Sequence, residues 1–146
     1  SVSLQLSNTF GGIYQKHFLK KLNKKLTQKT LSFPHDISLE DIEKLNTLKK
    51  FDDFYTAPSH GFNEAFDYYD KCSSKPLLEM IKHPVLLVNA LDDPFLPKEC
   101  YPFDILSKHK FINYETPKHG GHLAFIKSFS NQTCWYPERI CEFISS

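Results

Sequence analysis

The apolar segment "PVLLVNA" at residues 84–90 is the feature that most constrains the fold of this chain. A continuous run of aliphatic and β-branched residues after a proline is typical of a strand that is buried on both faces of a parallel sheet. A second strand-like segment, "KFINYE" at residues 110–115, follows after enough residues for a crossover helix. The order strand, crossover, strand predicts an α/β fold, in which such connections are right-handed.

The end of the chain predicts a helix that packs against this sheet. In "YPERICEFISS", Pro137 is expected at the first helical position, with Ile140, Phe143 and Ile144 facing inward. Two strands do not complete an α/β core, because a buried parallel strand needs neighbours on both edges. The segment "SVSLQL" at residues 1–6 is the other strand candidate. The chain is therefore expected to be the second half of a domain.

The first 75 residues predict helices rather than strands. Ser38 in "SLED" is expected to cap a helix, with Asp41 three residues on. The lysine-rich face of residues 14–29 either faces solvent or binds phosphates, and the balanced net charge of +1 favours the solvated face. Apolar residues at helical spacing mark three segments: Tyr14, Phe18, Leu19, Leu22 and Leu26; Leu39, Ile42, Leu45 and Leu48; Phe62, Ala65, Phe66 and Tyr69.

Composition excludes several classes of protein. The net charge of +1 gives no electrostatic case for binding nucleic acid. No apolar run reaches the roughly 18 residues of a membrane span, and the first residues lack the pattern of a signal peptide. Four cysteines without a C-x-x-C pair predict free thiols of an intracellular protein, and a disulfide between two of them is the alternative.

Asp93 and His122 are the candidate catalytic residues, because each follows a predicted strand. Ligands bind outside the carboxyl ends of the strands in open α/β sheets, so the two side chains are expected to face one site. A carboxylate that accepts a proton from one imidazole nitrogen fixes the tautomer and stabilises the imidazolium formed in catalysis. Pro94 favours extended backbone at Asp93, and only one of two adjacent carboxylates can point at His122. Asp92 is expected to hydrogen-bond amides of its own loop.

Other residues support weaker alternatives. His119 and His122 form H-x-x-H, but the glycines between them argue against a metal site. Cys72 has no base beside it, which argues against a nucleophilic role. Aromatic side chains between residues 62 and 69 either wall an acyl pocket or belong to a helix core.

The motifs "LVNALDDPFLP" and "KHGGHLAF" resemble the acid and histidine segments of the α/β-hydrolase superfamily. Together with "LKKFDDFYTAPSHGFNEAFDYYDKCS", they resemble its YheT-like branch, bacterial relatives of the ABHD-type lipid hydrolases. The resemblance runs from about residue 10 to the C-terminus, and Ala90 replaces the usual glycine. The spacing of the superfamily, with the acid four positions before Pro97, also selects Asp93.

The resemblance implies the C-terminal portion of an α/β-hydrolase fold preceded by a helical cap. Residues 1–12 would end the preceding core segment, 13–75 would form the cap or lid, and 76–146 would carry the acid and histidine loops. It implies hydrolysis of acyl esters, or acyl transfer, by a serine esterase without a metal or cofactor. The same resemblance places His60 near the site, where it either lines the cap or closes a turn against Gly61. Phe62 is a candidate substrate-binding residue beside it.

The nucleophile of such an enzyme is missing from these residues. The serine of this fold lies in a G-x-S-x-G turn, and the 146 residues contain no such motif. We therefore expect the chain alone to be inactive, and the alternative is a catalytically inactive module that binds a lipid or a partner. Expected partners are a hydrophobic acyl ester, the missing N-terminal half and, through an unpaired strand edge, a second copy of the chain; nothing supports a membrane surface or nucleic acid. A bacterial cytoplasmic location is the expectation.

Overall fold

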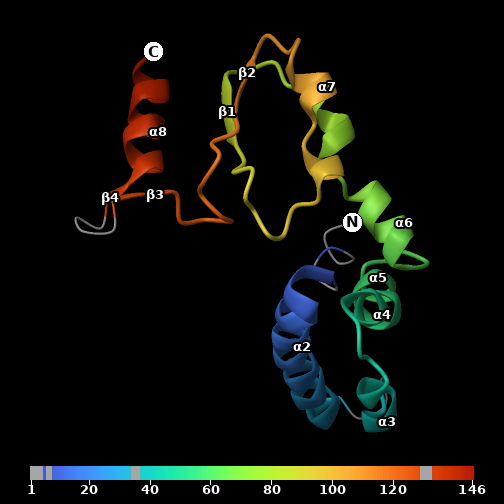
Figure 1. Cartoon of the computed structure of the whole chain (residues 1–146). Helices are drawn as coiled ribbons and strands as arrows, with labels where there is room; N and C mark the ends of the chain where they lie inside the picture. Colours follow the sequence, from blue (N-terminus) through green and yellow to red (C-terminus); the bar gives the residue numbers. More distant parts are fainter. Residues whose placement is uncertain (1–4, 6–7, 34–36, 129–132) are drawn as a thin grey trace. The chain divides into compact units, whose positions relative to one another are not determined.

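The computed structural model describes residue 5 and residues 8–33, 37–128 and 133–146 (Figure 1). The chain divides into two compact units, Ser1–Ser73 and Ser74–Ser146. The possible strand at residues 1–6 falls largely outside the described residues. Within the described part of the chain, no helix is long and apolar enough to cross a membrane. All four cysteines are free thiols, as the sequence predicts.

The first unit is helical and packs around its longest helix, α2 (Figure 1). Leu19 and Leu26 of this helix are buried in a cluster with Ile42, Leu45 and Phe51, whereas Phe18 on the predicted stripe is exposed. The elements are η1 (Thr9–Gly12), α2 (Ile13–Ser32), α3 (Leu39–Glu43), α4 (Leu48–Phe51), η2 (Asp52–Thr56), α5 (Ala57–Ser59) and α6 (Ala65–Lys71).

Side-chain caps decide where the short helices of this unit begin. The Ser38 hydroxyl accepts a hydrogen bond from the amide of Asp41 at 3.1 Å, which confirms the predicted cap of α3. The continuous helix predicted from Leu39 to Leu48 is wrong, because the chain turns after α3 and Thr47 caps a new helix by accepting from the amide of Lys50. The Asn23 side chain stabilises this break by donating to the carbonyl of Leu45.

Helix α6 is shorter than the aromatic spacing predicts. It begins at Ala65, where the amide donates to Asp53 at 2.9 Å, so Phe62 precedes it. Ala65 is fully buried, but Phe66 is exposed. Of the predicted apolar face, Ala65 is buried, Phe62 and Tyr69 are half-buried and only Phe66 is exposed.

The second unit contains the predicted parallel strand pair, β1 (Val85–Val88) and β2 (Ile112–Glu115) (Figure 1). Val85 pairs with Ile112 and Val88 with Glu115. The crossover between them contains η4 (Lys98–Cys100) and α7 (Phe103–Leu106), and η3 (Lys75–Met80) precedes β1. A short antiparallel pair, β3 (Ile126–Ser128) and β4 (Thr133–Cys134), which the sequence did not predict, leads into α8 (Trp135–Ser145). These elements form a small mixed α/β unit.

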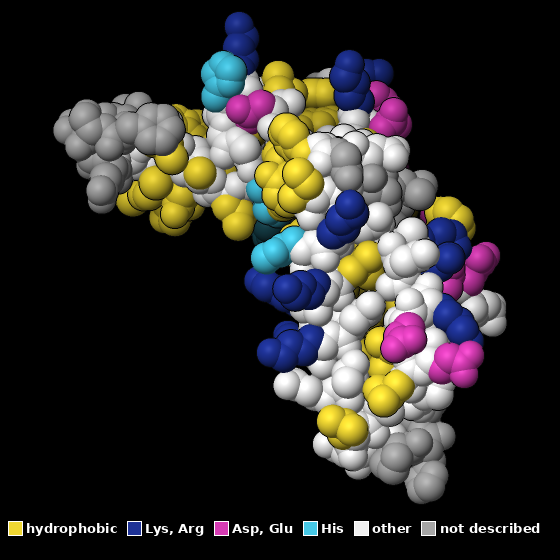
Figure 2. Space-filling view, turned by 60° about the horizontal axis from the view of Figure 1, so that its bottom comes forward, with side chains coloured by type: hydrophobic (Ala, Val, Ile, Leu, Met, Phe, Trp, Pro, Cys, Tyr) yellow, Lys and Arg dark blue, Asp and Glu magenta, His cyan; other side chains and the backbone are white. Residues whose placement is uncertain are grey.

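Two details of the second unit differ from prediction. Helix α8 begins at Trp135, so Pro137 is its third residue rather than its first. Ile140, Phe143 and Ile144 line a groove with residues of β1, on the side predicted, but the face is not buried, since Ile144 is 77% exposed and Ile140 is also exposed. Figure 2 shows hydrophobic side chains gathered at the left, on the side where α8 lies in Figure 1.

Strand β1 is half-buried along its length rather than buried on both faces. Among the described residues it pairs only with β2, so one edge has no neighbour. A groove of about 420 Å³ lies between β1 and α8. Its lining is mostly apolar: Pro84, Val85, Leu86, Val88, Trp135, Tyr136, Arg139, Ile140, Phe143 and Ile144. Apolar side chains of α8 therefore stay exposed on the side that faces this groove.

Candidate active site

The loop after β1 holds Asp93 in a buried turn. Asn89–Asp92 separate the strand from Asp93, whose amide donates to the carbonyl of Ala90 at 3.3 Å. Oδ1 of Asp93 accepts a hydrogen bond from the amide of Phe95 at 2.8 Å. This side-chain turn across Pro94 fixes the carboxylate, because one oxygen is committed to the backbone and the other stays directed away from the loop.

The loop after β2 turns sharply at two glycines before His122. Gly121 has φ +56°, a backbone conformation that other residues rarely adopt. A Cβ at Gly120 would lie 2.6 Å from the ring of Phe125 and 2.9 Å from Cβ of Ala90. The turn therefore requires glycine at both positions, for backbone conformation at one and for space at the other.

Backbone hydrogen bonds continue the pairing of β1 and β2 into both loops. The amide of Asn89 donates to the carbonyl of Glu115 at 3.1 Å, and the amide of Leu91 donates to the carbonyl of Pro117 at 2.9 Å. Asp93 and His122 are distant in sequence, and this extended ladder brings their loops side by side.

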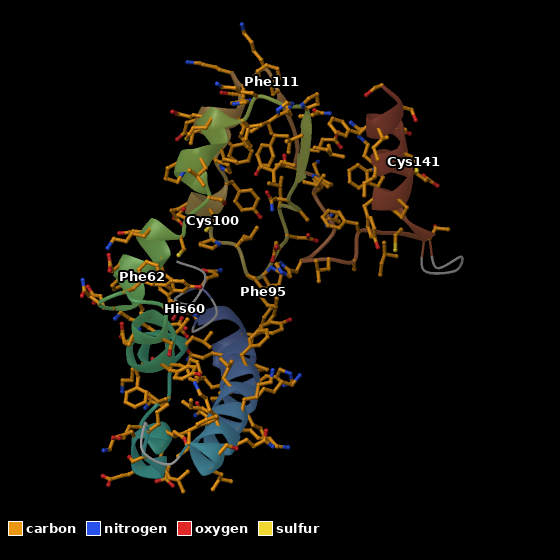
Figure 3. All side chains as sticks on the ribbon, turned by 180° about the vertical axis from the view of Figure 1, so that it is seen from behind. His60, Phe62, Phe95, Cys100, Phe111 and Cys141 are labelled. Carbon is orange, nitrogen blue, oxygen red and sulfur yellow. The ribbon has the colours of Figure 1, made fainter. Side chains whose placement is uncertain are left out.

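Asp93 and His122 contact each other directly. Oδ2 of Asp93 lies 2.8 Å from Nδ1 of His122. The Asp93 side chain is only 3% exposed, whereas that of His122 is 47% exposed. Because an ionised carboxylate can only accept, Nδ1 is the donor and Nε2 is left as the basic nitrogen. Phe95 lies on the loop after β1 (Figure 3). The centroid of its ring is 4.7 Å from that of the His122 imidazole, so the two rings pack against each other.

Asp92 holds the other loop rather than its own. Its Oδ1 accepts hydrogen bonds from the amides of Gly120 at 3.0 Å and Gly121 at 2.8 Å. Its Oδ2 lies 3.3 Å from Nδ1 of His119. The expected contact with amides of its own loop is therefore wrong, because the turn at Gly120 and Gly121 presents two successive amides to this carboxylate.

The hydrogen bond from Gly121 is the main cause that lowers the pKa of Asp92, and those from His119 and Gly120 add to it. A carboxyl group whose pKa is lower in the folded chain stabilises the fold above its unfolded pKa. That contribution is lost as the pH falls through the folded pKa. The contact between the two loops is therefore strongest near neutral pH and weakens in acid.

Tyr101 is a structural residue of the site that the sequence did not indicate. Its hydroxyl donates to the carbonyl of Ala90 at 2.6 Å and so ties the crossover to the acid loop. Burial raises the pKa of Tyr101, and the charges of Asp93 and Asp92 raise it further, so the phenol stays a donor.

His60 and Phe62, labelled in Figure 3, belong to the first unit, whereas Asp93 and His122 belong to the second. His60 follows α5, where Gly61 has φ +79° and the amide of Phe62 donates to the carbonyl of Ala57 at 2.9 Å. The ring of Phe62 packs on Tyr68 with centroids 5.4 Å apart. Each residue has a structural role in this turn, and the expected role in substrate binding stays a prediction.

The two histidines of H-x-x-H do not converge. His119 contacts Asp92 and His122 contacts Asp93. In the described ranges of the chain, no group of three or more His, Cys, Asp or Glu side chains is arranged to hold a metal ion.

Comparison with known proteins identifies the family. The chain is 31% identical over 147 aligned residues to YheT of Escherichia coli (strain K12), which covers 99% of this chain and 43% of that protein. It is 32% identical over 107 residues to an abhydrolase domain-containing protein of Dictyostelium discoideum, covering 73% of this chain and 27% of the relative. The chain belongs to the α/β-hydrolase family. The matched segments lie in the C-terminal part of the relatives.

A third relative adds an enzyme with a descriptive name. Medium-chain fatty acid ethyl ester synthase/esterase 2 of Saccharomyces cerevisiae is 34% identical over 103 residues, which is 70% of this chain and 22% of the yeast protein. The chain thus spans less than half the length of the relatives it matches. No family model matches the chain. No solved structure matches it.

Proposed function

We propose that this chain supplies the acid and the general base of a serine hydrolase that acts on hydrophobic acyl esters. The observation that carries the proposal is the 2.8 Å contact between a buried Asp93 carboxylate and the half-exposed imidazole of His122. Burial protects the orienting charge from water, and exposure leaves Nε2 of His122 accessible to a nucleophile and a substrate. Membership of a family with named esterases supports the same reaction class.

In the proposed reaction, a serine hydroxyl attacks the ester carbonyl while Nε2 of His122 takes its proton. Asp93 stabilises the imidazolium, and His122 then returns the proton to the departing alcohol, which leaves an acyl-enzyme. Water or a second alcohol attacks that ester, again with His122 as base, and the serine is regenerated. The serine and most of the oxyanion hole would come from residues outside this chain, because G-x-S-x-G does not occur in it.

The names of the relatives also indicate a substrate class, and the two segments of the chain would have different roles. The yeast relative is named for both synthesis and hydrolysis of medium-chain fatty acid ethyl esters, so we propose an acyl ester of a hydrophobic acid with water or an alcohol as acceptor. Residues 13–75 would form the lid, and residues 76–146 would carry the acid and histidine loops. His60 and Phe62 would be the substrate-binding residues of the lid.

The chain alone is expected to hydrolyse no p-nitrophenyl ester above background, because Asp93 and His122 have no serine of a G-x-S-x-G motif to activate. The complete protein, with its preceding segment, is expected to hydrolyse medium-chain p-nitrophenyl esters and to lose this activity in His122→Ala. The measurement is release of p-nitrophenolate by equal concentrations of the two proteins.

Turnover by the isolated chain that disappears in His122→Ala would contradict the assignment of the nucleophile to a preceding segment. A folded complete protein that turns over no ester but binds fatty acids or their esters would instead support the inactive binding module. Lys108→Ala deletes an exposed side chain in the crossover and serves as the control for His122→Ala.

A further inference from the structure

The turn that presents His122 is packed at Gly120, where a Cβ would lie 2.6 Å from the ring of Phe125, but it is open at Gly121, the residue next to His122. Gly121 has no heavy atom within 4 Å of the place where a Cβ would lie, and the turn sits at the surface. The backbone ladder between the two loops ends with the contact between Leu91 and Pro117, before the glycines. Something beyond the ladder must set the position of His122 relative to Asp93.

Asp92 makes the contacts that extend the ladder to the glycines. One oxygen, Oδ1, accepts from two successive amides at 3.0 and 2.8 Å, and these amides immediately precede His122. Hydrogen bonds from backbone amides to an ionised carboxylate are shorter and stronger than neutral ones. Two donors on one oxygen also fix the orientation of the turn, because both amides must point at the same carboxylate oxygen.

The neighbouring residue, Asp93, contacts the imidazole of His122 itself at 2.8 Å. Adjacent carboxylates therefore bind adjacent parts of one turn, the first its backbone and the second its side chain. A displacement of the turn relative to Asp92 would separate Nδ1 of His122 from Oδ2 of Asp93, since both contacts start from the same short loop.

We propose that Asp92 is a positioning residue, which holds the backbone of the glycine turn so that His122 meets Asp93 in the orientation needed for proton transfer. This inference rests on the proposed function and adds a residue to it. Asp92 touches no reacting group; it acts through the amides of Gly120 and Gly121. The requirement is for a hydrogen-bond acceptor at Oδ1, so asparagine is expected to replace aspartate here.

The test compares Asp92→Ala with Asp92→Asn in two measurements. In the 146-residue chain, the nitrogen chemical shifts of the His122 ring report whether Nδ1 carries the proton and donates it to Asp93. In the complete protein, steady-state kinetics separate kcat from KM. We expect Asp92→Ala to lose the Nδ1-protonated state and to lower kcat by about 10²-fold at nearly unchanged KM, as small misplacements of catalytic groups do. Asp92→Asn is expected to restore both.

Each outcome decides the inference. An Asp92→Ala variant that keeps the wild-type ring signature overturns it, and so does an Asp92→Asn variant that is as impaired as Asp92→Ala. If the complete wild-type protein has no esterase activity, the proposed function fails, but the ring signature in the chain still tests the positioning role. Asp92→Ser, whose shorter side chain cannot reach both amides, replaces Asp92→Ala if the latter does not fold. Asp104→Ala, at an exposed position of α7, is the matched control.

Discussion

Replacing Asp93 with asparagine is expected to lower kcat of the complete hydrolase by about 10⁴-fold, the size of the loss that this change causes in a serine protease. The asparagine amide would donate toward Nδ1 of His122, which at present lies 2.8 Å from an accepting oxygen. The imidazole would then carry its proton on Nε2, where it cannot accept the proton of serine. The expected loss is in kcat, because the carboxylate is not part of the surface that binds the ester.

Steady-state kinetics with a p-nitrophenyl ester measure this effect, and circular dichroism checks that the variant folds. Asp104→Asn makes the same chemical change at an exposed position on α7 and is expected to leave kcat within twofold of wild type. An Asp93→Asn variant with near-normal kcat, alongside an inactive Asp92→Asn variant, would show that the two carboxylates have been assigned the wrong way round.

Replacing Leu26 with alanine is expected to destabilise the first unit by about 2–5 kcal/mol, the range found for Leu→Ala in protein cores. Leu26 is 3% exposed in the cluster that joins α2 to the residues of α3 and α4. The change removes apolar contacts and leaves a cavity, because the surrounding side chains relax only partly into the space that leucine occupied. Urea unfolding of the 146-residue chain, followed by the helical circular dichroism signal, measures the loss.

Leu31→Ala provides a matched control on the same helix, because Leu31 is 72% exposed. It is expected to change the unfolding free energy by less than about 0.5 kcal/mol, as exposed substitutions do. The fluorescence of Trp135, the single tryptophan, follows the second unit separately. Equal destabilisation by the two substitutions would mean that the described core of the first unit is not what stabilises it.

The sequence predicted the parts of the fold whose patterns are strictly local. The parallel strands came from two short apolar segments, and the helix cap came from Ser38 and Asp41. It failed where spacing alone extended an element, as from Leu39 to Leu48, because α3 ends at Glu43 and Thr47 caps a new helix within the same apolar spacing. For α8 it predicted the residues that line the groove with β1 but not that they stay exposed, because burial depends on which neighbours a segment has and not on its periodicity.

At the candidate site, strand ends and turn residues were enough to predict that Asp93 and His122 meet, since parallel strands place their following loops at one edge of a sheet. The partner of Asp92 could not be predicted, because it depends on how the glycine turn directs two amides toward a side chain in another loop. The role of Tyr101 could not be predicted for a similar reason. Its partner is a backbone carbonyl, which carries no sequence signal.

The uneven burial of Asp93 and His122 also determines which of the two side chains a chemical reagent can modify. Asp93 is enclosed, so reagents that couple to carboxyl groups would encounter Asp92 first, whose side chain is 42% exposed. Electrophiles that acylate imidazole would find the open edge of His122. Of these two side chains, His122 is therefore the one that an electrophile can reach, whereas the Asp93 carboxylate is buried in the turn where it accepts from the amide of Phe95.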